Sequence, residues 1–345
     1  MITSVTLRNF KSFLERTIDF APLTVLTGMN GSGKSSVIQA IRMIQKSCGD
    51  GQGNPILDDH VMPNQLKTKL TKEDFYMLSF IKDKISYTTE VKEIETDSYG
   101  FVADDGHRKN DLDCISYLSA DRYGPKNQLP AGNTKEINDV GELGEYVISF
   151  LDKYQYSKVP EILRLNPEDE NLLDNTNAWL KVISKDSLLT YDKNQTQNVY
   201  YPFYNGIVPS ETGYGLSFTL PVIVSLLYSD EHNAERTLMV ENPEAHLHPA
   251  AQTALGKLIA LSAAHGKQVI IETHSDHIID GIRIAAKQGN IKASDVKFHF
   301  FRRDSFEEET TIESPELYQD GKLSFWPEGF FDQGLKDKAL LARKI

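Results

Sequence analysis

Cysteine is scarce in this chain, and its scarcity excludes two kinds of structure. The 345 residues include only two cysteines, Cys48 and Cys114, and no C-x-x-C pair. Two isolated thiols supply neither a disulfide framework nor the cysteine cluster of a zinc knuckle. We therefore expect two reduced thiols in a cytoplasmic protein, with 40% hydrophobic residues to build its core.

Signals for export and for membrane insertion are also missing. Residues 1–10 alternate apolar and polar side chains as a strand does, and no basic segment precedes an apolar one, so no signal peptide is expected. The most apolar stretch, residues 216–228, is too short for a membrane-spanning helix, which needs about 20 apolar residues. The sequence predicts a soluble protein without a membrane partner.

Positive charge is in deficit. Lys and Arg number 37 against 49 Asp and Glu, which gives a formal net charge of −12. Phosphate backbones bind clustered positive charge, so the chain as a whole is not suited to nucleic acid. Two short basic clusters, at residues 8–16 and 302–303, leave a local contact with DNA as an open alternative.

The chain has no heptad run, internal repeat or low-complexity segment, so a long coiled-coil arm is not expected. Residues 75–120 hold short β-branched runs typical of antiparallel strands, and residues 141–186 have helical patterns. From residue 213 helical and strand patterns alternate, which predicts a mostly parallel α/β sheet. The expected lobes are an N-terminal lobe over residues 1–48, a β-rich lobe over 49–125, a helical insertion over 126–211, an α/β lobe over 212–304 and a C-terminal extension over 305–345.

Residues 28–35 read GMNGSGKS and fit the pattern G-x-x-x-x-G-K-[ST] at every fixed position. A strand pattern at 23–27 precedes them and a helical pattern at 35–45 follows, which is the context that this motif requires. Glycines let backbone N–H groups turn toward phosphate oxygens, and the positive helix N-terminus faces the same anion. Lys34 is expected to reach the β- and γ-phosphates, and the Ser35 hydroxyl is expected to ligate Mg²⁺.

The nucleotide predicted for this loop is ATP. A guanine-reading motif of the N/T-K-x-D kind occurs only at residues 71–74, in a polar segment without the strand it needs. The sequence therefore predicts ATP and Mg²⁺ as ligands. The residues expected to bind the phosphates are Asn30, Gly31, Ser32, Gly33, Lys34, Ser35 and Ser36.

A second polar motif follows a buried strand pattern. Residues 237–249 read TLMVENPEAHLHP, so an acid stands at the tip of the strand. A carboxylate at such a tip, beside a phosphate loop, holds Mg²⁺ through water, and Glu241 is the candidate. A further group must orient the attacking water, and both Asn242 and Glu244 remain open for this role.

A histidine ends the next strand pattern, QVIIETHS at residues 268–275. At this tip His274 can hydrogen-bond the γ-phosphate and sense its loss. Together with His246, His248 and His277 it also suggests a metal site. The absence of an H-E-x-x-H pattern and of a cysteine partner argues against zinc.

Residues 212–217, TGYGLS, precede an apolar helical pattern at 218–228. Glycines and a serine at a helix N-terminus form an anion-binding element. Two phosphate-seeking elements in one chain make sense if Gly213, Gly215 and Ser217 bind the ATP of a neighbouring subunit. The sequence therefore predicts a homodimer or a larger homo-oligomer.

The order of these motifs resembles the ABC/SMC-like ATPases, whose relatives include RecF-type repair proteins and OLD-family ATPases. The resemblance covers most of the chain and begins with NFKS at residues 9–12. SYLSADRYGP at residues 116–125 looks like a further family segment, and residues 323–333, which end in WPEGFFDQ, resemble a C-terminal domain of unknown function. The resemblance implies an α/β P-loop NTPase of ABC/SMC-head type, with a mostly parallel core sheet, an antiparallel β lobe and a small helical insertion.

The same resemblance implies a role for each matching position. Residues 30–36 would bind phosphates, Gly215 and Ser217 would dock on the partner's ATP, Glu241 would be the Walker B acid, Leu247 and His248 would form the D-loop, and His274 would be the switch histidine.

Several positions depart from the family pattern. The Walker B acid is Glu241 rather than Asp, and Asn242 stands where these ATPases usually carry the catalytic Glu. An amide orients water but cannot accept its proton at neutral pH, so slow hydrolysis is expected. No Q-loop glutamine is evident, and Asp121 and Arg122 are the candidates to couple the lobes. The Toprim nuclease domain of many OLD proteins is not expected, because the sequence ends at Ile345.

The leading hypothesis is an ATP-dependent regulator that closes two heads around ATP. The resemblance implies that it acts with a separately encoded effector, such as a nuclease, in bacterial anti-phage defence. The alternative is a DNA-maintenance ATPase of RecF or SMC type that binds DNA directly. A transporter ATPase would carry an LSGGQ-like signature, and a small-molecule kinase would explain neither the signature nor His274.

Overall fold

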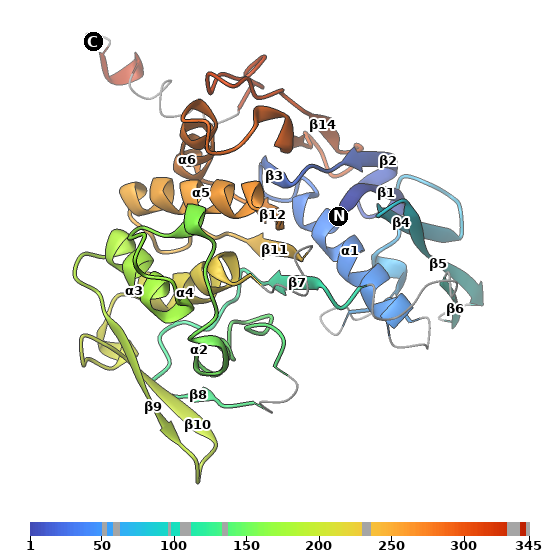
Figure 1. Ribbon diagram of the computed structural model, residues 1–345. Coiled ribbons are helices and arrows are strands. Elements are labelled where there is room, and N and C mark those ends of the chain that lie inside the picture. Colours follow the sequence, from blue (N-terminus) through green and yellow to red (C-terminus); the bar gives the residue numbers. More distant parts are fainter. Residues whose placement is uncertain are drawn as a thin grey trace. The chain divides into compact units, whose positions relative to one another are not determined.

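The chain folds into two compact units (Figure 1). The computed structural model describes residues 1–49, 54–57, 63–95, 98–103, 112–132, 137–229, 236–329 and 339–342. Unit 1 comprises Met1–Cys114, Val296–Tyr318 and Lys322–Ile345, and unit 2 comprises Ile115–Asp295 and Gln319–Gly321. This division does not test the five lobes expected from the sequence, and their bounds stay predictions.

An antiparallel sheet in the order β2-β1-β4-β5-β6 belongs to unit 1. Its strands are β1 (Ile2–Phe10), β2 (Phe13–Asp19), β4 (Phe75–Lys82), β5 (Ile85–Glu95) and β6 (Ser98–Ala103). β1 and β2 pair as far as Phe10 and Phe13, and the short turn between them uses a left-handed Lys11 with φ of 49°. The strand pattern of residues 1–10 is confirmed by β1, and the antiparallel strands predicted from residue 75 are confirmed by the pairs of β4, β5 and β6.

The remaining strands of unit 1 carry the phosphate loop. β3 (Leu23–Gly28) pairs in parallel with β13 (Val296–Arg302), which pairs antiparallel with β14 (Thr311–Glu313). α1 (Lys34–Gly49) follows β3 and packs against β4 and β5. The sequence predicts β13 as a strand of the C-terminal α/β alternation, yet it lies beside β3, because long-range contacts rather than chain order decide which strands pair.

Three parallel strands form the sheet of unit 2. β11 (Thr237–Glu241) lies between β7 (Ile115–Leu118) and β12 (Gln268–Glu272). Every residue of β12 is buried, as expected for a strand covered on both faces. The prediction that β7 belongs to the antiparallel region is wrong, since Ile115 and Leu118 pair in parallel with Thr237 and Val240. A strand this short holds no pattern that identifies its partner.

Helices alternate with the strands of unit 2 as the sequence predicts. They are α4 (Tyr214–Leu227), α5 (Pro249–Ala264) and α6 (Asp276–Lys287). α5 and α6 lie side by side (Figure 1), and a Cβ at Gly256 would meet the Ile278 carbonyl oxygen at 2.3 Å. A Cβ at Gly281 would meet the Thr253 carbonyl oxygen at 2.3 Å, so the two helix backbones are in direct contact. No helix among the described residues is long and apolar enough to cross a membrane.

The insertion at residues 126–211 is not only helical. α2 (Val147–Tyr154) and α3 (Leu172–Ile183) confirm the helices predicted there. An antiparallel sheet in the order β8-β10-β9 accompanies them, with β8 (Leu129–Pro130), β9 (Leu189–Asn194) and β10 (Val199–Tyr204). β9 and β10 form the long hairpin of Figure 1. β10 alternates buried and half-buried side chains, a period of two that the helical prediction overlooked.

Candidate functional site

The phosphate loop, residues 28–35, joins β3 to α1 in unit 1. Gly28, Gly31 and Gly33 have φ angles of 137°, 73° and 99°, which residues with a side chain rarely adopt. Such a backbone can present successive N–H groups to one anion. A Cβ at Gly28 would meet the Phe301 carbonyl oxygen at 2.1 Å, so the close approach of β13 also requires glycine there.

Hydroxyl groups from two distant segments support the phosphate loop from outside. The Thr310 hydroxyl donates to the Ser32 carbonyl oxygen at 2.9 Å and shares a 2.7 Å hydrogen bond with the Ser12 hydroxyl. The Thr310 N–H donates to the Ser12 carbonyl oxygen at 3.0 Å. Thr310 was missed by sequence reasoning because no motif surrounds it. Ser12 lies in the NFKS segment, but the pattern alone gave it no role.

Lys34 points its ammonium group into the phosphate loop. The side chain is buried, and its Nζ donates to the carbonyl oxygens of Met29 at 2.7 Å and of Gly28 at 3.2 Å. The residues predicted to bind phosphate all lie here: Asn30 and Gly31 are exposed, Ser32, Lys34 and Ser36 are buried, and Gly33 and Ser35 are intermediate. The site thus combines a glycine-rich backbone, an enclosed ammonium group and a helix N-terminus, which together suit a nucleoside triphosphate.

Acidic residues end two neighbouring strands of unit 2. Glu241 and Glu272 are the last residues of β11 and β12, and they are paired in register. Glu241 stands at a strand tip as the sequence predicts, whereas Glu272, which is buried, was not singled out although it also ends a strand. Among the described residues, no group of three or more His, Cys, Asp or Glu side chains could hold a metal ion. A Mg²⁺ ion would therefore take most of its ligands from phosphate and water, as is usual for it.

Asn242 directly follows β11 and is the second residue of the acidic loop, residues 241–248. Its φ of 45° is left-handed, a conformation that asparagine tolerates better than most residues. Its N–H donates to the Glu272 carbonyl oxygen at 2.8 Å. Its Oδ1 atom is enclosed and accepts no hydrogen bond from any described residue. At the tip of β11 the Asn242 Oδ1 atom is therefore an acceptor without a hydrogen-bond donor among the described residues.

The Glu244 carboxylate ties the acidic loop to the histidine loop, residues 273–275. The Thr273 hydroxyl donates to Oε2 at 2.8 Å, and the His274 N–H donates to Oε1 at 2.8 Å. Burial raises the pKa of Glu244, although these hydrogen bonds and the charge of Arg122 oppose the shift. Each carboxylate oxygen already accepts a hydrogen bond, so Glu244 differs in this respect from Asn242.

His274 is exposed between two buried neighbours, Thr273 and Ser275. The Ser275 hydroxyl caps α6 by accepting the N–H of Ile278 at 3.1 Å. Because β11 and β12 are parallel, the imidazole lies at the same end of the unit 2 sheet as Glu241.

Arg122 lies at the centre of this arrangement, and only 2% of it is exposed. Its guanidinium donates to four backbone carbonyl oxygens: those of Ser119, Glu241 and Asn242 at 2.7 Å each, and that of Phe218 at 3.1 Å. Burial lowers the pKa of Arg122 to about 10, and the carboxylates of Glu244 and Glu241 oppose this shift. Asp121, the other residue predicted to couple the lobes, is exposed, and its N–H donates to the Ser119 hydroxyl at 3.1 Å.

The signature segment, residues 212–217, contains the start of α4. Gly213 is the N-cap residue and Tyr214 the first helical residue, and both are exposed. No side chain among the described residues caps this end of α4. Ser217 lies one turn inside the helix, and its hydroxyl is hydrogen-bonded to Tyr204 of β10. The structure therefore brings Gly213 and Gly215 to the helix N-terminus but not the Ser217 hydroxyl.

The first turn of α4 rests on the acidic loop. A Cβ at Gly215 would meet the His246 carbonyl oxygen at 2.9 Å, so only glycine allows this approach without displacement. The His246 ring packs on Phe218 and Tyr214, with ring centroids 4.6 and 5.3 Å apart. A ligand at the N-terminus of α4 would therefore meet a surface that two segments share.

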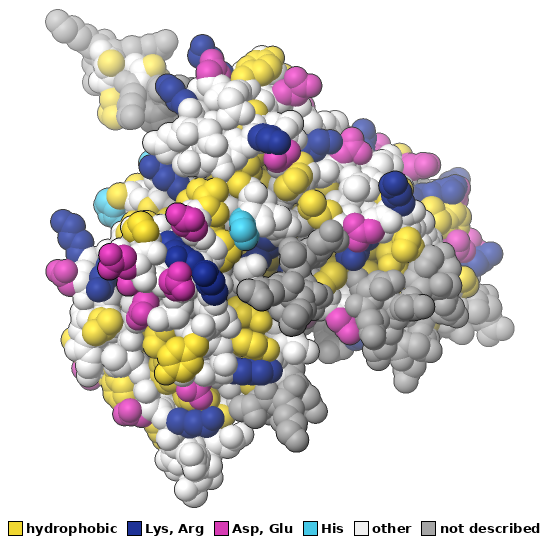
Figure 2. Space-filling model, viewed as in Figure 1, with side chains coloured by type: hydrophobic (Ala, Val, Ile, Leu, Met, Phe, Trp, Pro, Cys, Tyr) yellow, Lys and Arg dark blue, Asp and Glu magenta, His cyan; other side chains and the backbone are white. Residues whose placement is uncertain are grey.

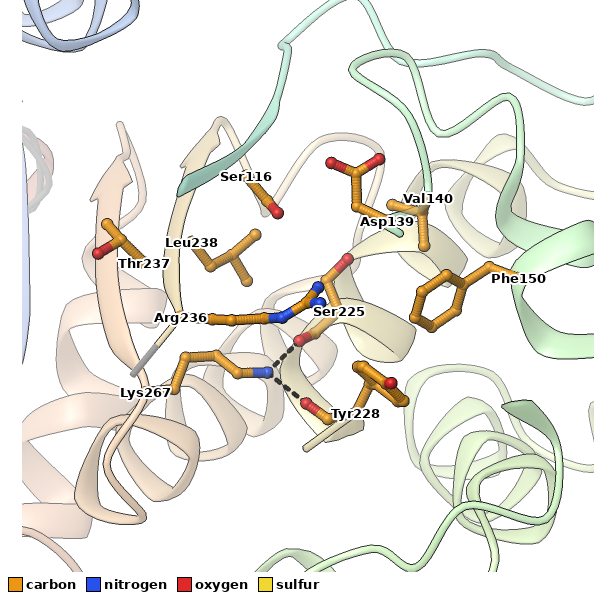
Figure 3. Close-up of a pocket in the computed structure, with 10 residues that line it drawn as sticks. All are labelled: Ser116, Asp139, Val140, Phe150, Ser225, Tyr228, Arg236, Thr237, Leu238 and Lys267. Atoms are coloured by element: carbon orange, nitrogen blue, oxygen red, sulfur yellow. Dashed lines mark hydrogen bonds between the residues drawn. The ribbon is translucent and has the colours of Figure 1, made fainter. Parts of the chain in front are cut away.

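A cation caps the opposite end of α4 (Figure 3). The Lys267 ammonium group donates to the carbonyl oxygens of Ser225 and Tyr228, drawn as dashed lines in Figure 3. It also donates to that of Leu226, at the end of α4 where the helix dipole is negative. Burial lowers the pKa of Lys267 to about 7, and the charge of Arg236 adds to this shift. Lys267 and Arg236 line a small pocket with Phe150 and Asp139. The ammonium group in this pocket is hydrogen-bonded to the end of α4, so its role is to cap the helix.

Acidic and basic side chains are interspersed on the face shown in Figure 2. The basic clusters noted in the sequence have acidic neighbours within unit 1: Arg8 lies 3.7 Å from Glu73, Arg16 lies 3.9 Å from Glu309, and Arg302 lies 2.7 Å from Asp304. These pairs reduce the local positive charge that a DNA backbone would need.

Two family models match the chain. One, described as "AAA ATPase domain" (AAA_15), matches residues 1–211 and 174–279, which include the phosphate, acidic and histidine loops. The other, described as "Protein of unknown function (DUF3696)", matches residues 291–341. The WPEGFFDQ motif falls in this second range, and its last residues, 330–333, lie outside the described residues.

A curated relative and solved structures of SMC heads are similar to the chain. It is 26% identical over 263 residues to "Septu protein PtuA" of Bacillus mycoides (strain KBAB4), a match that covers 72% of this chain and 34% of that protein. The SMC head bound to the C-winged helix domain of ScpA has a TM-score of 0.57 at 13% identity, covering 92% of this chain and 98% of that chain. The Smc head with an extended coiled coil, bound to the C-terminal domain of ScpA derived from Pyrococcus furiosus, has a TM-score of 0.54 at 12% identity, covering 99% of each chain. The fold is thus the α/β P-loop fold of SMC heads.

Proposed function

The chain belongs to the AAA_15 family of AAA ATPase domains, and from this premise we propose that it binds ATP with Mg²⁺ and hydrolyses it slowly between two copies of itself. The observation that carries the proposal is the phosphate loop. Its three left-handed glycines, the enclosed Lys34 and the start of α1 form a site suited to a triphosphate.

Each copy would supply a first set of contacts to its own ATP. Residues 30–36 hold the phosphates, and Lys34 exchanges its carbonyl partners for phosphate oxygens. Ser35 and Glu241 are the residues that would hold Mg²⁺. Bound Mg²⁺ neutralises charge on the β- and γ-phosphates. His274 contacts the γ-phosphate, in agreement with its exposure at the strand end.

The second copy would close on the same ATP with the N-terminus of α4. The uncapped first turn offers backbone N–H groups at the positive end of a helix dipole. Gly213 and Gly215 let a phosphate approach this backbone closely. Ser217 contributes indirectly, because its hydroxyl is engaged with Tyr204.

Asn242 is the residue that we expect to orient the attacking water, and Glu244 to support it. The Asn242 Oδ1 atom is the left-over acceptor, whereas both Glu244 oxygens hold the histidine loop. An amide aligns water without accepting its proton, so hydrolysis proceeds slowly. ATP would then hold two copies closed for a long time in each cycle.

The biological setting that we propose is bacterial anti-phage defence, in which the closed dimer acts with a separately encoded effector such as a nuclease. The similarity to the Septu protein PtuA supports this setting. The chain spans 34% of that protein's length, so the partner and the activity of the whole assembly belong to the proposal.

A DNA-maintenance role is the second candidate, because the fold is that of SMC heads. The acidic balance and the paired basic clusters do not favour it. DNA is therefore included as a variable in the test.

ATP turnover and oligomeric mass, measured together with and without DNA, test the proposal. In Lys34→Ala we expect ATP affinity to fall about a hundred-fold, because charge-assisted contacts to two phosphates are worth roughly 3 kcal/mol in total. The exposed Lys72→Ala is the matched control. In Asn242→Asp, an isosteric change that adds a carboxylate, we expect faster turnover by at least about ten-fold.

A wild-type mass that doubles with ATP, and that stays monomeric in Lys34→Ala, would support the closed dimer. Turnover without any change of mass would contradict it. A strong rise of turnover with DNA would favour the maintenance role instead. No acceleration in Asn242→Asp would remove Asn242 from the water-orienting position.

A further inference from the structure

Buried Arg122 bonds to backbone groups from three separate segments of unit 2. Its Nη1 reaches the Ser119 carbonyl beyond β7 and, together with Nη2, the first two carbonyls of the acidic loop, while its Nε reaches the Phe218 carbonyl in α4. These four acceptors are ordinary backbone carbonyls. A donor group binds all four at once only if its N–H groups are fixed in one plane and point in the right directions. The guanidinium group has that geometry, and an ammonium group does not.

A chain of contacts continues from Arg122 to the histidine loop. The Arg122 charge faces the Glu244 carboxylate, which accepts hydrogen bonds from Thr273 and from the His274 N–H. Asn242, the residue with the left-over Oδ1, has its own carbonyl oxygen held by Arg122 at 2.7 Å. The positions of Asn242 and His274 are therefore both set by groups that Arg122 engages.

The same guanidinium contacts the first turns of α4 through Phe218. Gly215 lies against the His246 carbonyl oxygen and the Phe218 ring packs on the His246 ring, so helix and loop touch at two points. A shift of the α4 N-terminus would thus pull on Arg122 and on the acidic loop together.

We propose that Arg122 is a positioning residue, which makes the start of α4, the acidic loop and the histidine loop move as one body. A phosphate that docks on α4 from a second copy would thereby align the water-orienting Asn242 of this copy. This inference rests on the proposed function, and it adds a means by which each ATP site reads the occupancy of the other.

Arg122→Lys is the decisive variant, because it keeps the charge and removes the fork of donors. Arg164→Lys is the matched control, since Arg164 is also buried and donates to backbone carbonyls, those of Val159 at 2.8 Å and Pro167 at 3.1 Å. In Arg122→Lys we expect kcat for ATP to fall at least about ten-fold, because small misplacements of catalytic groups are costly. The KM for ATP should change less than about three-fold, because the phosphate loop is in unit 1.

Hydrogen exchange gives a readout that does not depend on turnover. In Arg122→Lys, the amides of residues 214–218 and 242–248 should exchange faster together, whereas in Arg164→Lys neither range should change. If the wild type fails to hydrolyse ATP, the proposed function fails, and the exchange pattern alone decides whether Arg122 couples these segments.

Glu244→Gln perturbs the same hydrogen-bond network while Arg122 stays in place. It is the variant to measure if Arg122→Lys does not fold. We expect the kcat loss and the joint exchange change again, and no further loss in the double variant, because the two residues act as one unit. The proposal is overturned if kcat in Arg122→Lys matches that of Arg164→Lys. Additive losses in the double variant, or faster exchange in only one of the two ranges, would overturn it as well.

Discussion

The phosphate loop of unit 1 and the acidic loop of unit 2 both follow a buried strand that pairs in parallel, but they are supported by opposite means. Neutral hydroxyls, those of Ser12 and Thr310, support the phosphate loop. A buried arginine and a carboxylate, Arg122 and Glu244, support the acidic loop. Neutral support leaves the backbone N–H groups for an anion, whereas charged support fixes the acidic loop and costs desolvation.

This difference teaches where each loop is vulnerable. The phosphate loop depends on backbone conformation and on close approach, so that added atoms harm it most. Unit 2 contains buried charged side chains, so its free energy of unfolding should change with pH as these side chains gain or lose protons. Three predictions, from the largest expected effect to the smallest, separate these dependences.

Replacement of Gly28 by Ala should have the largest effect. Its new Cβ would meet the Phe301 backbone oxygen at 2.1 Å, and no side-chain movement relieves that overlap. We expect a loss of about 3 kcal/mol or more in the free energy of unfolding, measured in urea without nucleotide. Gly31→Ala is the matched control: its φ is also positive, at 73°, but nothing lies within 4 Å, so about 1 kcal/mol is expected. Equal losses in both variants would show that conformation alone, and not the approach of β13, requires Gly28.

The pH dependence of stability should report Lys267 in unit 2. Its pKa is lowered to about 7 in the folded chain, against 10.5 for the unfolded residue. Between these values the unfolded chain binds the proton and the folded chain does not, so stability rises with pH through this window. The expected slope is at most about 1.4 kcal/mol per pH unit.

Lys267→Met removes the titrating group, so the difference in unfolding free energy between wild type and variant isolates it. Denaturation in urea at several values between pH 7 and 10 gives this difference. We expect the wild type to gain on the variant as pH rises. A difference that stays constant with pH would mean that the ammonium group remains protonated at the end of α4.

Removal of the Thr310 hydroxyl, which supports the phosphate loop, should have the smallest effect on the free energy of unfolding. Thr310→Val keeps the shape of the side chain and removes the hydrogen bonds to Ser32 and Ser12, at an expected cost of about 1–2 kcal/mol. The neighbouring Thr311→Val serves as control, because Thr311 is exposed and should change stability by less than about 0.5 kcal/mol. A loss as large as that in Gly28→Ala would contradict the view that backbone conformation and close approach, more than the hydroxyl hydrogen bonds, stabilise the phosphate loop.

The phosphate loop could be predicted from the sequence because its determinants are contiguous. Glycines, Lys34 and the flanking strand and helix patterns all lie within residues 23–45. Strand β1 and the alternation of α4, β11, α5 and β12 were predictable for the same reason, since each depends on local periodicity.

Features that depend on distant backbone groups could not be predicted. Arg122 was a candidate for coupling, but its four acceptors are carbonyls, which leave no trace in a sequence. The place of Ser217 in α4 also depends on where the helix begins, and with its start at Tyr214 the serine lies one turn inside it, so the contact with a partner's ATP stays a prediction. The β9–β10 hairpin was overlooked because the helices around it dominated the pattern.

The glycine contact between α5 and α6 has a consequence for how this chain can vary in length. α5 begins at Pro249, directly behind the acidic loop, and α6 begins at Asp276, directly behind the histidine loop. One residue inserted between Pro249 and Gly256 would rotate that glycine by about 100° out of the contact. Insertions and deletions should therefore be excluded from the first two turns of both helices. They should be better tolerated after Lys287, beyond both helices and both loops.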